Sequence, residues 1–533
     1  MKLTVKFRTP AASGSDRRQW LSRSAQLCAA LLAWHAPASR SVVPAGGAFA
    51  ADPFALGVAS GAPAEDSVVI WTRLCTDPLA LEGLGAEQWR VGWECAADEA
   101  FRRVVRRGQV VAHPDLGHSV HVEVDGLQPG RPYWYRFHVG GGASAATSPV
   151  GRTLTAPPRA AAGGALRFAF ASCQQYEQGW YSAWRHLLDE SPDLVVFLGD
   201  YIYESSWGRH KVRAHGRGEP FTLEEYRARH ALYRSDAHLQ RMHAAAPWLV
   251  TWDDHEVDND YARDRAEDLA EGFPARRAAA YQAFFEHMPL RELARPRDGV
   301  MRLHSHHRFG ALAEFFVLDD RQYRDYQACP RPGRGGSRRV TDCDERLDPT
   351  RTLLGFEQER WLGAGFAQSR ARWNVIAQQT LFSQLDSAPG PGQRFWTDGW
   401  DGYPAARRRL TDAISGSKLA NPLIIGGDVH ANWVCDVLED FERPRSRVIA
   451  TEFCGTSITS QGRPQRQLDL ERVENPHVRF AESTHRGYVS MRLTPDRCEA
   501  TLRVLDDVTD PHTAIRTRAA FVVESGHPGA HSA

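Results

Sequence analysis

The pattern of apolar and polar positions changes near residue 160 of the chain. Between residues 54 and 155, short segments alternate aromatic or β-branched residues with polar ones, as in SVVIWTRL, QWRVGWEC and HSVHVEVDGLQPG. Gly and Pro turns separate these segments, which is typical of antiparallel strands with one buried face. We therefore expect residues 51–155 to form a small β-sandwich of immunoglobulin or fibronectin type.

A different pattern follows residues 156–165, a stretch rich in Pro, Gly and Ala that we interpret as a linker. Beyond it, unbroken apolar runs alternate with stretches of helical spacing; the runs are LRFAFASC, DLVVFLGD, WLVTWDD, EFFVLDD, WNVIAQQ and PLIIGGDVH. Continuous apolarity predicts strands that are covered on both faces. Residues 166–533 are therefore predicted to form a layered α/β domain, and a chain of 533 residues is long enough for two domains.

Overall charge excludes two classes of partner. The chain has 65 Lys and Arg residues and 65 Asp and Glu residues, so its formal net charge is zero. The net charge of the protein therefore creates no overall electrostatic attraction to nucleic acid or to an anionic membrane surface.

Residues 1–50 have the features of an export signal. Arg17 and Arg18 precede the apolar stretch AQLCAALLAW, and AFA at 48–50 supplies the small residues that a signal peptidase recognises. The apolar stretch is too short for a transmembrane anchor. The paired arginines indicate the twin-arginine export machinery, with an ordinary secretory signal as the alternative. We expect a periplasmic or secreted bacterial protein.

The cysteines suggest one disulfide bond and exclude two kinds of site. Cys329 and Cys343 flank the loop PRPGRGGSRRVTD, and in an oxidising compartment we expect them to pair. The sequence has no CxxC pair, which removes the main support for a zinc ribbon or a thioredoxin-like redox centre.

Polar residues with metal-binding chemistry follow most of the apolar runs: Cys173, Asp200, Asp253 to His255, Asp319, Asp320, Asp428 and His430. Ligands of α/β proteins gather beyond the carboxyl ends of the strands, where loops from several strands converge. Carboxylates crowded into one cleft resist ionisation unless cations compensate them. The sequence therefore predicts a metal site.

Two of these strand ends share a pattern. In FLGDYIYE, Asp200 follows a glycine and Tyr203 lies three residues later. In IIGGDVH, Asp428 and His430 are two residues apart, so in an extended chain their side chains point the same way. Asp-x-His after Gly-Gly at a strand end favours a metal site over a simple turn.

Taken together, FASCQ, GDYIYE, WDDHEVDN and GGDVH, in this order, resemble the PhoD-type alkaline phosphatases and phosphodiesterases, a branch of the calcineurin-like metallophosphoesterases. The resemblance extends to FALGVASGAPAEDSVVIWTRL in the β domain and to RRAAAYQAFFEHMPLR and LDDRQYRD further on. It implies a four-layered α/β/β/α metallophosphoesterase sandwich preceded by the β-sandwich domain.

The same resemblance implies a centre that holds ferric iron (Fe3+) and calcium (Ca2+). Cys173, Asp200, Tyr203 and His430 match the iron positions. Asp200 would bridge to calcium, which Asp428 and a residue of the WDDHEVDN block would also bind. Asp254 and Asn259 both remain candidates for that last position.

The implied reaction is hydrolysis of phosphate monoesters or diesters by a metal-bound hydroxide. His255 is the candidate to protonate the leaving oxygen or to hold the phosphate. Arg276 and Arg277 are candidates for binding substrate oxygens, although both also suit a solvated helix. Asp253 and Glu256 are expected to be supporting or surface groups, and Asp319 and Asp320 to have no direct role.

Two alternatives remain open at this stage. The enzyme could be a phosphodiesterase or phospholipase D-like enzyme that acts on teichoic acid, phospholipid or nucleotide diesters. A non-enzymatic alternative is a binding module that acts through its β domain and carries an inactive metal domain. The intact set of candidate metal ligands weighs against it.

Overall fold

A computed structural model describes residues 42–43, 49, 51–81, 83–141, 145–161 and 163–533. The predicted export signal at 1–50 lies outside these ranges apart from residues 42, 43 and 49. Among the described residues, no helix combines the length and apolarity needed to cross a membrane.

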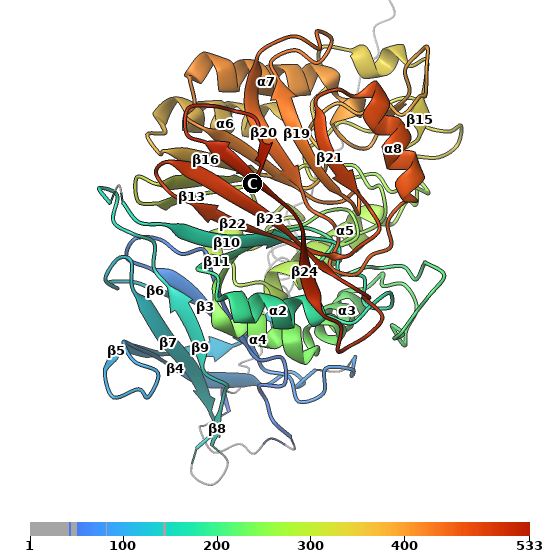
Figure 1. The fold of residues 1–533 in the computed structure, drawn as a ribbon. Helices are drawn as coiled ribbons and strands as arrows, with labels where there is room; N and C mark the ends of the chain where they lie inside the picture. The colour runs from blue at the N-terminus through green and yellow to red at the C-terminus, as the bar shows by residue number, and fades with distance from the viewer. Residues whose placement is uncertain (1–41, 44–48, 50, 82, 142–144, 162) are drawn as a thin grey trace, which may run out of the picture.

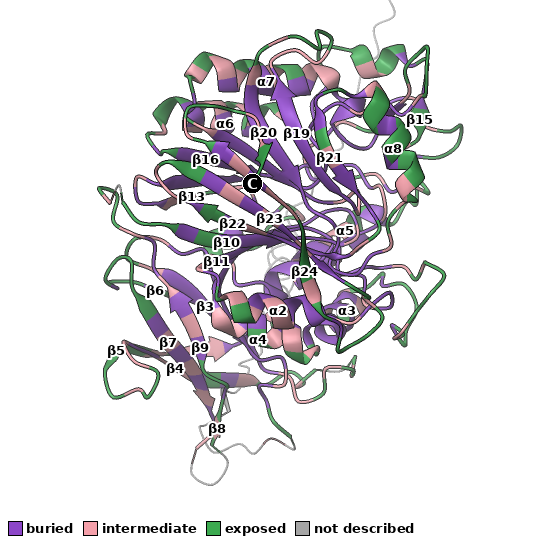
Figure 2. Cartoon of the chain, viewed as in Figure 1, coloured by how far each residue is buried: buried purple, intermediate pink, exposed green. Residues whose placement is uncertain are grey.

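Two β-sheets lie face to face in the larger part of the molecule (Figure 1). Strand β14 (Ala313–Val317) shows why both faces are apolar: Phe315 packs between the sheets, whereas its neighbour Phe316 packs outward against helices. Side chains of a strand alternate between its faces, so a run that is buried on both sides must be apolar throughout. Figure 2 shows the resulting concentration of buried residues in the two sheets.

The first sheet has ten strands in the order β25-β24-β23-β22-β10-β11-β12-β2-β3-β6. Strands β10, β11 and β12 are parallel neighbours, so their carboxyl ends lie on one edge. The bounds are β2 Val58–Gly61, β3 Val68–Arg73, β6 Ser119–Val124, β10 Leu166–Ala171, β11 Leu194–Leu198, β12 Pro247–Thr251, β22 Gly487–Leu493, β23 Arg497–Leu505, β24 Ile515–Glu524 and β25 His531–Ser532.

The second sheet has seven strands in the order β13-β14-β16-β18-β20-β19-β21. Strands β14, β16, β18 and β20 are parallel in this sheet. The bounds of the other strands are β13 Ser305–Phe309, β16 Trp373–Ala377, β18 Pro422–Gly426, β19 Asn432–Leu438, β20 Val448–Cys454 and β21 Val478–Glu482.

Helices cover the outer faces of both sheets, which confirms the predicted four layers. The ten-stranded sheet is covered by α2 (Ser182–Glu190), α3 (Leu223–Arg234), α4 (Ala237–Ala245) and α5 (Phe273–His287). The seven-stranded sheet is covered by α6 (Phe356–Gln368) and α7 (Pro404–Ser417). A further helix, α8 (Gln465–Glu474), contacts β21.

The N-terminal β-rich part shares a sheet with the larger part. One of its two sheets contains β1 (Val42–Val43), β4 (Gln88–Ala96), β5 (Val104–Ala112), β7 (Pro132–Val139), β8 (Ala146–Thr147) and β9 (Gly151–Leu154). The other consists of β2, β3 and β6, and β2 pairs with β12 in parallel through Ser60–Pro247 and Gly61–Trp248. The sandwich is therefore built partly on the end of the ten-stranded sheet.

A long connection between β14 and α6 carries a disulfide bond. Cys329 and Cys343 are joined, which confirms the predicted pairing. Strand β15 (Arg339–Val340) lies inside this loop and pairs with β17 (Phe395–Trp396). This strand pairing places Arg339 opposite Trp396, inside the loop that the disulfide closes.

Candidate metal centre and active site

The predicted metal-binding residues converge where the carboxyl ends of parallel strands from both sheets meet. Cys173 follows β10, Asp200 follows β11 and Asp254 follows β12, all in the ten-stranded sheet. Asp428 and His430 follow β18 of the seven-stranded sheet. Parallel strands place their carboxyl ends on one edge, which is why distant segments meet here.

The backbone is held in an unusual conformation at four of these positions. Cys173, Asp200, Asp428 and His430 have φ angles of 58°, 56°, 63° and 52°. This left-handed region disfavours residues with a Cβ atom, at about 1–2 kcal/mol each. Such conformations persist where the surrounding structure enforces them, and they occur preferentially at functional sites.

Glycines let the loops that carry the ligands approach closely. Within the ten-stranded sheet, a Cβ atom on Gly199, which has a φ of 109°, would lie 2.5 Å from Cβ of Asp253 in the loop after β12. Between the two sheets, a Cβ atom on Gly427 would lie 2.2 Å from Oγ of Ser172. The glycines before Asp200 and Asp428 are therefore required for these loops to pack together.

Four donor groups form the first part of the centre. Donor atoms of Cys173, Asp200 and His430 lie within 4.8 Å of one another. The Tyr203 hydroxyl donates to Asp200 Oδ2 at 2.8 Å and lies 3.1 Å from His430 Nε2. A thiol, a phenol, a carboxylate and an imidazole therefore face one point.

His430 is prepared to act as a ligand through Nε2. Its Nδ1 lies 2.9 Å from the carbonyl oxygen of Gln461, which can only accept, so Nδ1 carries the proton. Burial and the nearby Arg486 lower the pKa of His430 to about 3, so the ring is neutral. A backbone partner that fixes the tautomer in this way is typical of metal-binding histidines.

The buried acidic groups of the centre are suited to binding a cation. Burial, together with neighbouring carboxylates, raises the pKa of Asp200 and Asp428 well above the usual range. Asp200 Oδ1 and Asp428 Oδ2 are buried and have no hydrogen-bond partner. Burial and the proximity of Asp200 also raise the pKa of Cys173 and Tyr203. Positive charge would satisfy the free oxygens and stabilise all four anions.

Asp254 and Asn259 occupy different positions around the second part of the centre. Donor atoms of Asp200, Asp254 and His255 lie within 4.8 Å of one another. Asn259 lines the same cavity, but its amide nitrogen donates to Glu267 at 2.9 Å and its backbone N–H donates to Glu204 at 3.2 Å.

His255 is held by a buried carboxylate. Its Nδ1 lies 2.7 Å from Glu204 Oε2, and its ring lies 4.2 Å from that of Tyr203. Burial disfavours the charged ring, but the carboxylates of Glu204, Asp254 and Asp200 outweigh it and raise the pKa of His255 well above its usual value. These carboxylates therefore favour the protonated form of the ring.

A buried arginine supports the second part of the centre from behind. Arg321, which is 1% exposed, pairs with Asp253, with Asp254 at 3.6 Å and with Asp398 at 2.7 Å. Arg324 pairs with Asp398 at 2.8 Å. Asp253 is therefore a buried supporting group, and Arg321 fixes the WDD segment against the loop that carries Asp398.

Glu256 shapes the loops that present the ligands. Its carboxylate accepts hydrogen bonds from the backbone N–H groups of Asp200 at 3.0 Å, Tyr201 at 2.5 Å and Asp253 at 2.7 Å. The side chain is fully buried. It therefore ties the strand ends of β11 and β12 together.

We expect Glu256→Ala to lower the free energy of unfolding by about 3 kcal/mol or more, because three buried N–H groups lose their acceptor. Glu256→Gln, which keeps one acceptor oxygen in the same volume, is expected to cost less. Urea denaturation measures both changes, and an alanine variant within about 0.5 kcal/mol of wild type would contradict this role.

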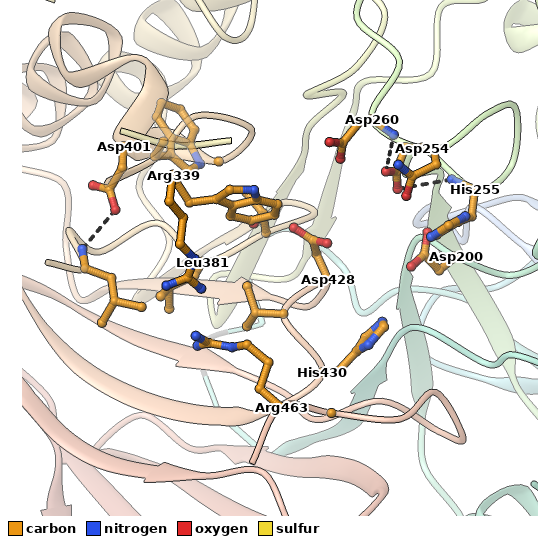
Figure 3. A pocket seen from close by; sticks show the side chains of 18 of the residues that line it. Asp200, Asp254, His255, Asp260, Arg339, Leu381, Asp401, Asp428, His430 and Arg463 are labelled. Atoms are coloured by element: carbon orange, nitrogen blue, oxygen red, sulfur yellow. Dashed lines mark hydrogen bonds between the residues drawn. The ribbon is translucent and has the colours of Figure 1, made fainter. Parts of the chain in front are cut away.

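A cavity of about 620 Å3 opens onto the centre. Asp200, Asp254, His255, Asp428 and His430 line one part of it, and Figure 3 shows their side chains around the same space. Trp207 also lines the cavity, and its ring stacks against His430 at 5.8 Å. The metal-binding residues are therefore accessible to a small-molecule substrate.

Arg276 and Arg277 do not line this cavity. Arg276 bonds to Tyr226, Asp258 and Glu219 instead, at 2.9, 3.0 and 2.6 Å. Arg277 donates to the carbonyl oxygens of Arg263 and Gly299. Both lie on α5, whose contacts direct them to the outer layer, so the structure does not support a role for them in substrate binding.

Asp319 and Asp320 also lie outside the cavity lining. Asp319 accepts hydrogen bonds from Trp252 Nε1 and from the backbone of Arg321, both at 3.0 Å. Burial raises the pKa of Asp320 to about 7. Both residues therefore belong to the support behind the centre.

Sequence reasoning missed several residues that complete the site: Glu204, Arg321, Asp398, Arg339 and Arg463. Glu204 ends the GDYIYE segment and Arg321 follows the LDD segment, so their positions beside known motifs were a usable signal. Asp398, Arg339 and Arg463 stand in segments without any recognisable pattern.

Comparison with known families gives two matches along the chain. Residues 168–502 match the model described as PhoD-like phosphatase. Residues 40–157 match the model described as PhoD-like phosphatase, N-terminal domain.

The chain is also similar to individual phosphatases. Alkaline phosphatase D of Bacillus subtilis (strain 168) is 47% identical over 491 residues, which cover 90% of this chain and 82% of that protein. The solved structure of PhoD superposes with a TM-score of 0.85 at 45% identity and covers 91% of this chain and 93% of that one. A purple acid phosphatase from yellow lupin (Lupinus luteus) seeds shares the fold, with a TM-score of 0.52 at 11% identity over 88% and 73% of the two chains.

Proposed function

Because the chain belongs to the PhoD-like phosphatase family, we propose that it is an exported alkaline phosphatase whose centre uses ferric iron and calcium to hydrolyse phosphate esters. The observation that carries the proposal is the convergence of Cys173, Asp200, Tyr203 and His430. Two of them, Asp200 and His430, line the cavity together with Asp254, His255 and Asp428. This complete set of donors argues against a binding module with an inactive centre.

The donor types favour iron on one side of the centre. Cys173, Tyr203, Asp200 and His430 would hold it, and three of these groups become anions when they release their protons. Three anionic ligands suit a trivalent ion, and phenolate is an established iron ligand in proteins. Release of the Cys173 and Tyr203 protons should therefore accompany metal binding.

Oxygen donors favour calcium on the other side. Asp200, Asp254 and Asp428 supply carboxylates, the ligand type that calcium prefers. We assign Asp254 rather than Asn259 to this position, because its carboxylate lies within 4.8 Å of the donor atom of Asp200 and supplies the negative charge that suits calcium, whereas Asn259 lines the cavity with a neutral amide.

The protein's own residues prepare the substrate and the leaving group. When bound, the cations would neutralise phosphate charge and acidify a water molecule into a nucleophile. Glu204 accepts from Nδ1 of His255, and the ring lines the cavity, so Nε2 is the nitrogen left free for the substrate. A proton on Nε2 would be donated to the leaving oxygen as the phosphate ester bond breaks.

This role predicts a specific dependence on the leaving group. We expect His255→Gln to slow hydrolysis of an alkyl phosphate by about 10²- to 10⁴-fold and hydrolysis of 4-nitrophenyl phosphate much less, because nitrophenolate leaves without a proton. Steady-state kinetics on both esters measures the two effects. An equal loss on both would contradict proton donation and would indicate phosphate binding instead.

The choice between monoesters and diesters can be tested directly. Rates on 4-nitrophenyl phosphate and on bis(4-nitrophenyl) phosphate compare the two classes with the same leaving group. The proposal of a phosphatase predicts turnover of the monoester; activity confined to the diester would support a phosphodiesterase, and no turnover of either would overturn the proposed function.

Export can be tested through the paired arginines. If the twin-arginine machinery carries the protein, replacing Arg17 and Arg18 with lysines should leave the precursor inside the cell. Immunoblots of periplasmic or extracellular fractions measure the change. Unchanged export would favour the ordinary secretory route.

A further inference from the structure

The cavity has a second end whose charge is opposite to that of the metal centre. Arg339 and Arg463 both line it. In Figure 3 their guanidinium groups lie near one another on one side of Asp428, whereas Asp200, Asp254 and His255 lie on the other side. One cavity therefore joins a cluster of acids to a pair of arginines.

The two arginines share a single carboxylate. Arg463 makes a two-pronged contact with Glu471 of α8, at 2.7 and 2.9 Å, and Arg339 Nη1 lies 3.3 Å from the same side chain. Glu471 is 5% exposed, whereas the side chains of Arg339 and Arg463 are 38% and 26% exposed. Asp401 also lines this end of the cavity, but it pairs with Arg407. Arg339 and Arg463 against Glu471 therefore leave an accessible positive surplus.

A strand pairing and a disulfide bond fix the position of Arg339. Arg339 lies opposite Trp396 in the β15–β17 pair, inside the loop that the Cys329–Cys343 disulfide closes. Burial lowers the pKa of Arg339, and the charges of Arg463 and Arg394 lower it further, whereas Glu471 opposes the shift. Two arginines that line one cavity beside a third indicate a site for an anion.

Apolar side chains also line the cavity. Leu381, Leu385 and Trp396 are among them, and the backbone N–H of Leu385 donates to Asp401 at the arginine end. A cavity of about 620 Å3 has room for more than the single phosphate that reacts at the metal centre. The apolar lining suits an organic spacer and would contribute little to binding inorganic phosphate.

We propose that Arg339 and Arg463 bind a second phosphate group of the substrate, so that this enzyme prefers phosphate esters in which a short organic spacer joins two phosphates. The inference rests on the proposed function, because the metal centre must hold the phosphate that reacts. Guanidinium groups bind phosphate through two parallel hydrogen bonds, which makes phosphate the anion that best fits the pair.

The test compares two non-hydrolysable ligands that differ only in a second phosphate-like group. Propylphosphonate and propane-1,3-diphosphonate compete with 4-nitrophenyl phosphate, and isothermal titration calorimetry measures their Kd values without turnover, because their P–C bonds are not cleaved. We expect the diphosphonate to bind roughly tenfold more tightly to the wild-type enzyme. Arg463→Gln and Arg339→Gln should each reduce this ratio, and the double variant should bring it close to one.

Arg472→Gln is the matched control, since Arg472 is exposed on α8 next to Glu471 and does not line the cavity. It should keep the wild-type ratio, and Arg463→Lys should keep part of it. Equal binding of the two ligands by wild type, an unchanged ratio in the double variant, or an equal loss in Arg472→Gln would each overturn the proposal. If Arg463→Gln fails to fold, Arg339→Gln, at an exposed position, decides the question.

The test distinguishes failure of the second phosphate site from failure of the proposed function. If 4-nitrophenyl phosphate is not hydrolysed but calorimetry still shows the expected ratio and its loss in the variants, the proposed function fails and the second phosphate site stands. If hydrolysis is normal and the two ligands bind equally, the proposed function stands and the second phosphate site fails.

Discussion

Replacing Asp200 with asparagine is expected to lower kcat/KM for 4-nitrophenyl phosphate by at least about 10³-fold. Asp200 is the residue that both groups of donors share: its carboxylate lies within 4.8 Å of Cys173 and His430 on one side, and of Asp254 and His255 on the other. One of its oxygens has no hydrogen-bond partner. Asparagine has nearly the same shape but cannot supply a negative charge to either position.

Metal content provides a second measurement for this variant. Elemental analysis of purified Asp200→Asn should show less than the wild-type content of both metals. Asp189→Asn, an exposed position on α2, is the control and should keep both activity and metals. More than about a tenth of wild-type activity with full metal content in Asp200→Asn would show that Asp200 is not shared by the two sides.

Replacing Arg321 with methionine is expected to lower the free energy of unfolding by about 3–5 kcal/mol. The side chain is buried and pairs with Asp253, Asp254 and Asp398, so its removal leaves three buried carboxylates without their shared cation. Arg321→Lys should rescue little, because a single ammonium group cannot face three carboxylates in the same geometry.

Urea denaturation measures this cost, and Arg408→Met provides the comparison. Arg408 on α7 is half exposed and pairs with the exposed Asp412 and with Asp440 near the surface. Its removal should cost no more than about 0.5 kcal/mol. A cost for Arg321→Met below about 1 kcal/mol would mean that the three carboxylates do not depend on it.

The layers of the fold were predictable because burial on both faces leaves a direct trace in the sequence. Phe315 and Phe316 face opposite layers, and only an unbroken apolar run satisfies both. The attachment of β2 to β12 left no such trace. Alternation reveals that a strand has one buried face, but it does not specify which strand lies beside it.

The metal centre was predictable for a similar reason, and the rest of the site was not. Asp200 and Asp428 stand at the ends of recognisable apolar runs, and strand ends of α/β proteins converge. Arg339 and Arg463 reach the cavity from irregular segments whose path depends on β15 and α8. Arg276 had a promising position in the sequence, but its side chain is engaged by Asp258 and Glu219.

We propose that this chain hydrolyses phosphate esters with iron and calcium held at the Asp200 centre. The most direct test measures hydrolysis of 4-nitrophenyl phosphate by purified protein before metal removal, after chelation, and after each metal is returned alone or together. We expect loss of activity on chelation and full recovery only with Fe3+ and Ca2+ together, and no recovery in Cys173→Ala. Undiminished hydrolysis by the metal-free protein would contradict it.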